Sequence, residues 1–198
     1  MKKEQLIVLG VVLLVIVLAV SFFTGTYNRL VAAEENVDSS WSQVENVYQR
    51  RTDLVPNLVA IVRAYAKHEK DTLEGVINAR AKASQMNINA DVVNNPEMLE
   101  QFQKAQGALS SALSRLMVVI ERYPELKADQ NFLTLQAQIE GTENRITVER
   151  KRYNDSAKLF NTLRRTFPNI FIAKIMGFAK KSYFTADEGA DKAPAVKF

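Results

Sequence analysis

Residues 6–23 read LIVLGVVLLVIVLAVSFF, a stretch of 18 residues without a charged side chain. As an α-helix, with a rise of about 1.5 Å per residue, this stretch would span about 27 Å, close to the thickness of the hydrocarbon core of a bilayer. A buried helix of a soluble protein is the first alternative, but the stretch has no polar face to turn toward water. We therefore predict a membrane-spanning helix here.

A cleavable signal peptide is the second alternative, because Ala19-Val20-Ser21 resembles a small-residue cleavage site. The apolar run continues past that site. This favours an anchor that is retained in the mature protein and comprises residues 1–26. The chain has no cysteine, so an anchor attached to a lipobox cysteine is excluded.

The charges flanking the apolar stretch suggest its orientation. Lys2 and Lys3 precede it, partly offset by Glu4, and Arg29 follows it before two glutamates at 34 and 35. The positive-inside rule then places the N-terminus in the cytoplasm and the rest of the chain on the other side. We expect a single-pass protein of the bacterial inner membrane.

After the anchor, apolar residues recur at steps of three and four, which is typical of amphipathic helices. The first run includes Val37, Trp41, Val44 and Tyr48, and three similar runs follow. Such stripes must pack against one another, which predicts an all-α fold: an up-and-down four-helix bundle with a short C-terminal amphipathic helix.

Prolines and polar turns set the expected helix ends. Pro56 disfavours helical geometry at Val55, so we expect a break or kink there. Asn95 is a candidate cap with Pro96 in the first turn, and Pro124 separates the last two runs. The predicted helices span residues 27–53, 56–86, 96–122 and 129–166, which makes 27–166 the bundle. One long helix through Pro56 is the alternative.

The composition excludes several classes of active site. Without cysteine there is no thiolate metal site and no cysteine nucleophile, and His68 is the only histidine. A di-iron bundle needs Glu-x-x-His motifs on two helices, which one histidine cannot supply within a protomer. Glycine-rich phosphate loops and Gly-x-Ser-x-Gly are absent. We expect no catalytic, cofactor or metal site and no nucleic-acid partner.

Residues 167–184 differ from the rest in chemistry. No acidic residue lies between Asp155 and Asp187. On a continuous helix the segment would be basic on one side and apolar on the other, which suits a membrane interface. The predicted interface residues are Phe167, Ile172, Lys174, Ile175, Met176, Phe178, Lys180, Lys181 and Tyr183. The alternative is that the segment folds back onto the bundle, while 185–198 form an irregular tail.

Several segments together resemble the LemA family. They include YNRLV at 27–31, VDSSWSQVE at 37–45, RRTDLVPNLV at 50–59 and AYAKHEKDTLEGVINARA at 64–81. The C-terminal half adds RYN at 152–154, FP at 167–168, GF at 177–178, YF at 183–184 and PAVKF at 194–198. The resemblance implies an N-terminal membrane helix followed by a four-helix bundle in bacterial membranes. It implies no catalytic residues.

A second set of residues is polar and expected to be structural. These are Arg50, Arg51 and Asp53, which lie just before Pro56. They could form an anion or partner site. Alternatively, they could form an ion pair with Glu140, Glu143 or Glu149 on the last helix. We favour the ion pair. Removing one partner of a buried pair costs roughly 3–5 kcal/mol, so such residues can matter for folding alone. His68 lies in the charged run 67–71 and is expected on a solvated helix face.

In an up-and-down bundle the fourth helix ends near the membrane, which brings residues 167–184 to the lipid surface. The expected partners are the lipid bilayer and further copies of the chain. We therefore expect a membrane-bound scaffold that self-associates and organises or remodels the bilayer. The alternative is an accessory subunit of a membrane signalling or proteolytic complex, with another membrane protein as partner.

Overall fold

The computed structural model describes residues 3–86 and 92–185, and all regular structure within these ranges is helical. The all-α prediction is therefore confirmed. Residues 87–91, part of the predicted polar turn, and 186–198, most of the predicted irregular tail, lie outside the described residues. The elements are α1 (Lys3–Tyr65), α2 (Lys70–Gln85), the 3-10 helix η1 (Val92–Asn94), α3 (Pro96–Ile120), α4 (Pro124–Lys127), α5 (Gln130–Arg165) and α6 (Asn169–Ile175).

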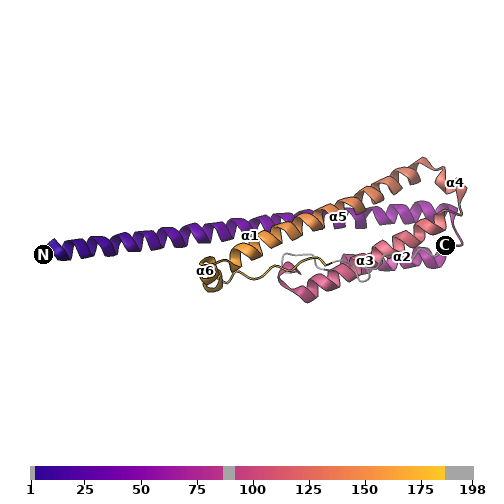
Figure 1. Ribbon diagram of the computed structural model, residues 1–198. Coiled ribbons are helices and arrows are strands. Elements are labelled where there is room, and N and C mark those ends of the chain that lie inside the picture. The colour runs from indigo at the N-terminus through magenta and orange to yellow at the C-terminus, as the bar shows by residue number, and fades with distance from the viewer. Residues whose placement is uncertain (1–2, 87–91, 186–198) are drawn as a thin grey trace, which may run out of the picture.

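Helix α1 joins the apolar stretch to the rest of the molecule without a break, and its first part extends alone beyond the other helices (Figure 1). The most apolar window of α1 has a mean hydropathy of 3.3, and none of that window is buried. By length and composition, α1 is the one helix among the described residues that could cross a membrane.

The predicted break at Pro56 is wrong, because α1 continues through it to Tyr65. Proline has no N–H, so the carbonyl of Thr52, four residues earlier, lacks its helical donor. Arg80 of α2 replaces that donor, with its Nε donating to the Thr52 carbonyl at 2.9 Å. A side chain from another helix thus satisfies the carbonyl, and the first break falls instead between Tyr65 and Lys70.

The long helices pack unequally. Helix α5 runs along α1, while α2 packs against α3 and α1 (Figure 1). The backbones of α3 and α5 approach each other less closely than those pairs. Large side chains, including Trp41, Phe102 and Tyr153, fill the space between them. This differs from the evenly packed four-helix bundle that the apolar stripes predict.

The core has two main parts along the bundle. The part far from the apolar stretch is mostly aliphatic and includes Val55, Leu58 and Leu116, together with Phe132. The part nearer that stretch is aromatic and gathers around Trp41. The cap predicted at Asn95 is present, since its side chain accepts from the N–H groups of Glu97 and Met98.

The C-terminal part departs from the predicted helix over 167–184. Helix α6 covers only Asn169–Ile175 and is followed by Gly177, whose φ of +76° is a conformation that favours glycine. Residues 178–185 then run back along the bundle without regular structure. We call residues 178–185 the extended segment.

Candidate membrane-contact site

Helix α6 lies beside α1 just after the apolar stretch ends. Its Ile172 and Ala173 are buried against Leu30 of α1. The rings of Tyr27 and Phe178 meet nearby, with centroids 5.9 Å apart. Since the apolar stretch ends at Phe23, these contacts place α6 where α1 would leave a bilayer (Figure 1).

The other side of α6 exposes large apolar side chains. Phe167 is 81% exposed, Ile175 75% and Phe171 60%, and Ile170 and Met176 are also exposed. We call these five residues the α6 apolar patch. Lys174 of α6 is exposed between Phe171 and Ile175 in the sequence, Lys180 is exposed in the extended segment, and no carboxylate follows Asp155 before Asp187. An exposed apolar patch bordered by cations suits the boundary between lipid headgroups and acyl chains.

The predicted interface residues divide between this patch and the protein interior. Phe167, Lys174, Ile175, Met176 and Lys180 are exposed. Two assignments are wrong, because Ile172 and Lys181 are only 5% and 3% exposed.

Ile172 is buried because its face of α6 packs against Leu30 of α1. Lys181 is buried because the helix ends at Ile175 and the chain then turns back, whereas the prediction assumed one helix through residue 184. Phe178 is half-buried, and Tyr183 belongs to the extended segment, where its hydroxyl accepts from Asn161. The prediction also omitted Ile170 and Phe171, which are exposed. Both are apolar residues of the same segment, 167–184, and could have been included from the sequence.

Lys181 is held inside the protein by two carboxylates of α1. Its Nζ lies 2.8 Å from Oε1 of Glu34 and 3.8 Å from Oδ1 of Asp38. It also lies over the ring of Phe160. Burial raises the pKa of Asp38, and the charge of Lys181 partly opposes that effect. The cation of Lys181 therefore belongs to an internal ion pair and not to a lipid surface.

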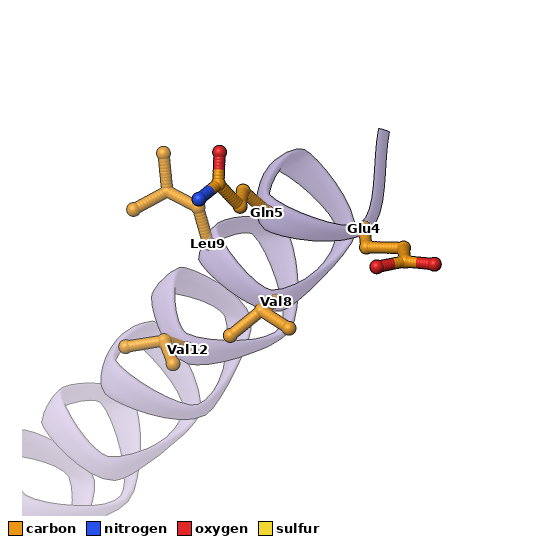
Figure 2. A pocket seen from close by; sticks show the side chains of 5 residues that line it. All are labelled: Glu4, Gln5, Val8, Leu9 and Val12. Atoms are coloured by element: carbon orange, nitrogen blue, oxygen red, sulfur yellow. The ribbon is translucent and has the colours of Figure 1, made fainter. Parts of the chain in front are cut away.

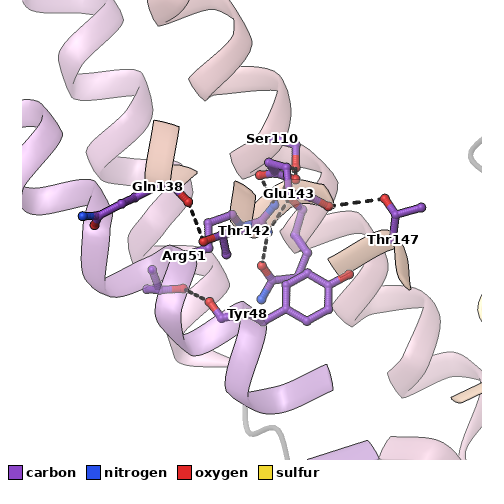
Figure 3. Close-up of polar contacts among 9 residues, drawn as sticks. Tyr48, Arg51, Ser110, Gln138, Thr142, Glu143 and Thr147 are labelled. Atoms are coloured by element: carbon purple, nitrogen blue, oxygen red, sulfur yellow. Dashed lines mark hydrogen bonds and ion pairs between the residues drawn. The ribbon is translucent and has the colours of Figure 1, made fainter. Parts of the chain in front are cut away.

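Arg51 joins three helices at the centre of the bundle (Figure 3). Its Nη1 donates to Ser110 of α3 at 2.6 Å and to Glu143 of α5 at 2.7 Å. Its Nη2 donates to the carbonyl and the side chain of Gln106. The guanidinium group also lies 5.1 Å from the ring centre of Tyr48. Glu143 is one of the three carboxylates considered from the sequence.

The other predicted polar residues lie outside this cluster. Arg50 is exposed, Asp53 accepts from Gln49, and Glu140 accepts from Gln136 on its own helix. His68 is exposed in the turn between α1 and α2. Within the described residues, no group of three or more histidine, aspartate or glutamate side chains could hold a metal ion.

A shallow hollow on the surface of α1 lies in and beside the apolar stretch (Figure 2). Glu4, Gln5, Val8, Leu9 and Val12 line it. All five side chains come from one helix and project outward. This surface would face lipid if α1 crosses a bilayer.

Comparisons with known proteins identify a family and several relatives. A family model described as the LemA family matches residues 40–198. Magnetosome protein MamQ 2 of Paramagnetospirillum magneticum is 26% identical, over 88% of this chain and 72% of the relative. Magnetosome protein MamQ of Magnetospirillum gryphiswaldense is 24% identical, over 83% of this chain and 66% of the relative. Protein LemA of Metamycoplasma hominis is 25% identical, over 84% of this chain and 72% of the relative.

Proposed function

Because the chain belongs to the LemA family, we propose that it is a membrane-anchored helical scaffold that self-associates and organises or remodels the bacterial membrane without catalysing a reaction. The observation that carries this proposal is the position of the α6 apolar patch beside the end of the apolar stretch. Two separate parts of the chain can then contact the same bilayer.

The two contacts differ in depth. Residues 6–23 span the hydrocarbon core as a helix of about 27 Å. The α6 apolar patch lies beside residues 27–30 and reaches only the boundary of one leaflet. The side chains of the α6 apolar patch, inserted like a wedge at that depth, add area to one leaflet only. Many copies together therefore favour curvature of the bilayer. The anchor holds each wedge at a fixed height.

Flanking charges support the orientation in this proposal. The lysines before the apolar stretch favour a cytoplasmic N-terminus. The bundle and α6 then lie on the non-cytoplasmic side of the inner membrane. The relatives named magnetosome proteins are consistent with a role at a membrane, and the mild net charge of +4 adds attraction to anionic lipids.

The test uses the absence of native cysteine to place one spin label per chain. Phe171→Cys puts the label in the α6 apolar patch, and Val118→Cys puts it on α3, where the side chain is 72% exposed and far from α6. In vesicles of phosphatidylcholine and phosphatidylglycerol, we expect the label at residue 171 to be accessible to oxygen and shielded from a water-soluble nickel complex. The label at residue 118 should show the opposite accessibility.

Equal accessibility at the two positions would show that α6 does not contact lipid. Assembly and remodelling are tested separately by electron microscopy of vesicles with the unmodified full-length protein. Ordered arrays or deformed vesicles are expected. A protein that remains monomeric in detergent and leaves vesicle shape unchanged would contradict the scaffold proposal.

A further inference from the structure

The extended segment is bound to α5 through its backbone. The side-chain amide of Asn161 donates to the Lys181 carbonyl at 2.8 Å and accepts from the Lys181 N–H at 3.0 Å. Asn154 repeats this pattern with Phe184, at 3.0 Å and 2.9 Å. Asn154 and Asn161 are seven positions apart, so both lie on one face of α5. Each asparagine side chain bonds only the backbone of one residue in the extended segment, and not the side chain of that residue.

Neighbouring elements bind the backbone between and beyond these two residues. The Tyr153 hydroxyl donates to the Ser182 carbonyl at 2.7 Å, and the Ser182 N–H donates to the Val93 carbonyl at 2.7 Å. At the end of the segment, Gln103 of α3 and Arg150 of α5 both donate to the Thr185 carbonyl. The extended segment is thus bonded to η1, α3 and α5.

Two side chains of the segment enter sites of opposite chemistry. The ammonium group of Lys181 meets the Glu34 and Asp38 carboxylates on α1. The ring of Phe184 stacks on Trp41, with centroids 5.8 Å apart, and packs edge-on against Tyr153 at 5.5 Å. Arg150 covers the same ring at 4.8 Å. Phe184 is 6% exposed, so the aromatic site encloses it almost completely.

These contacts have the features of a peptide-recognition site. Backbone hydrogen bonds provide affinity for any extended chain, and the sites for Lys181 and Phe184 select a basic residue three positions before an aromatic one. We call the contacting residues of α1, η1, α3 and α5 the acceptor surface. The described structure shows it occupied by the chain's own segment.

We propose that the acceptor surface also binds the extended segment of a second copy of this chain. This inference rests on the proposed self-association and supplies a contact for it. Every copy carries the same segment, and copies anchored through α1 share one orientation and one height above the bilayer. The acceptor surface of one copy therefore lies at the same level above the bilayer as the segment of a neighbour.

Reach and topology allow the exchange. Gly177, with its positive φ, joins the segment to α6 and can change direction without a side-chain clash. The link from Gly177 to Lys181, the first residue that the acceptor surface binds, spans about 14 Å when extended, so the segment can cross only between copies that pack directly side by side. The exchange we propose is one-way: the segment of one copy displaces the neighbour's own segment from the acceptor surface, and both anchors stay in the same membrane because the copies share one orientation. Confinement to a bilayer raises the effective concentration of the second segment.

The experiment uses two full-length chains, each with one cysteine and a different affinity tag, expressed in the same cell. Gln103→Cys labels the acceptor surface, and Thr185→Cys labels the segment beside it. A short thiol-to-thiol crosslinker applied to isolated membranes should give a covalent dimer carrying both tags. A pair of Lys127→Cys and Thr185→Cys chains measures random collision, because Lys127 lies in α4 at the far end of the bundle.

One substitution placed in either chain provides the decisive control. Phe184→Ala in the Gln103→Cys chain weakens the competing internal segment, so the yield of dimer should rise several-fold. The same substitution in the Thr185→Cys chain weakens the segment that must cross over, so the yield should fall several-fold. A fold defect would act in the same direction in both arrangements. Circular dichroism of each variant checks that helix content is retained.

Four outcomes would overturn the inference. A dimer yield no higher than the collision pair does so, as does Phe184→Ala acting alike in both chains. If the two tags purify together but no crosslink forms, the chains self-associate through another surface, and only this inference fails. If the tags do not purify together, the self-association in the proposed function fails as well.

Discussion

Arg51 carries a positive charge to the centre of the bundle, where it is 1% exposed. Its donors reach Ser110 and Gln106 on α3 and Glu143 on α5, so one residue of α1 sets the relative position of three helices. The ion pair is asymmetric, because the Glu143 side chain is 36% exposed. Water can therefore solvate Glu143 if its partner is lost, but it cannot reach Arg51.

Arg51→Ala is expected to lower the free energy of unfolding by roughly 3–5 kcal/mol, since it leaves buried polar partners on α3 unsatisfied. Urea unfolding of the full-length protein in detergent measures this, with fluorescence of the single tryptophan, Trp41, as the probe. Arg50→Ala is the matched control on the adjacent, exposed position and should change stability by less than about 0.5 kcal/mol. Similar losses in both variants would contradict the role of the buried cluster.

Asp38 gives the stability a pH dependence of known sign. Burial raises the pKa of Asp38 above its ordinary 3.8, so the folded protein binds this proton more tightly than the unfolded chain does. Stability is therefore expected to fall as the pH rises through the interval between 3.8 and the higher folded pKa.

Asp38→Asn should remove this part of the slope. The measurement is the urea midpoint at a series of pH values from about 4 to about 7, compared between the variant and the unmodified protein. Asp155→Asn, at an exposed position of α5, serves as the control and should leave the slope unchanged. A slope that is equally steep in the Asp38→Asn variant would show that burial of this carboxylate does not affect folding.

At the scale of single elements, the continuity of α1 depends on a contact with α2. Pro56 removes one helical hydrogen bond, and Arg80 of α2 bonds the freed Thr52 carbonyl. The two residues should therefore be energetically coupled. Arg80→Met is expected to cost about 1–3 kcal/mol, because the carbonyl of the buried Thr52 then lacks a partner.

In a Pro56→Ala background the same Arg80→Met substitution should cost much less, since the alanine N–H can bond the carbonyl directly. A double-mutant cycle by urea unfolding gives the coupling energy, expected within about 0.5–3 kcal/mol. Lys82→Met, at an exposed position of α2, should show no coupling to residue 56. Additive effects of Arg80→Met and Pro56→Ala would refute this account of α1.

The same elements show what the sequence could predict. The stripe through Val37, Trp41, Val44 and Tyr48 is buried as expected, because helical periodicity alone determines which face is apolar. The helix through Pro56 was expected only as the alternative, because the donor that replaces the missing N–H, Arg80, lies 28 residues from Thr52 in the sequence. Tertiary contacts of this kind leave no local pattern.

The candidate site was predicted in part for a similar reason. Exposure of Phe167, Lys174 and Ile175 follows from an amphipathic α6. Burial of Lys181 could not be predicted in this way, because the sequence of residues 178–184, taken alone, is as compatible with a helix as with an extended chain. The choice is made by Asn154 and Asn161 on α5, whose side chains bind an extended backbone.

At the scale of the whole molecule, α1 sets the distance between the membrane and the far end of the bundle. From Tyr27 to Tyr65 the helix rises about 57 Å at 1.5 Å per residue. That end carries a polar network, in which Tyr65 donates to Asp129, and Glu69 accepts from both Arg122 and Tyr123. If α1 crosses a bilayer, this end is the part of the described residues farthest from lipid.

A fluorophore at Lys127→Cys should keep its full intensity in vesicles that contain a headgroup-linked quencher, because it lies far above the bilayer. The same fluorophore at Phe167→Cys should be strongly quenched. The pair of measurements uses full-length protein in vesicles of identical composition. Strong quenching at residue 127 would mean that the bundle lies flat on the membrane.

The unbroken α1 has a mechanical consequence. A single spanning helix commonly tilts by about 20° to match the thickness of its bilayer. With no joint between the lipid-embedded half and the upright half, a lever arm of about 57 Å would swing its free end sideways by about 20 Å. A local thinning or thickening of the bilayer would thus be converted into a lateral displacement of the polar end of the bundle. Neighbouring molecules in the same patch of bilayer would tilt by similar angles.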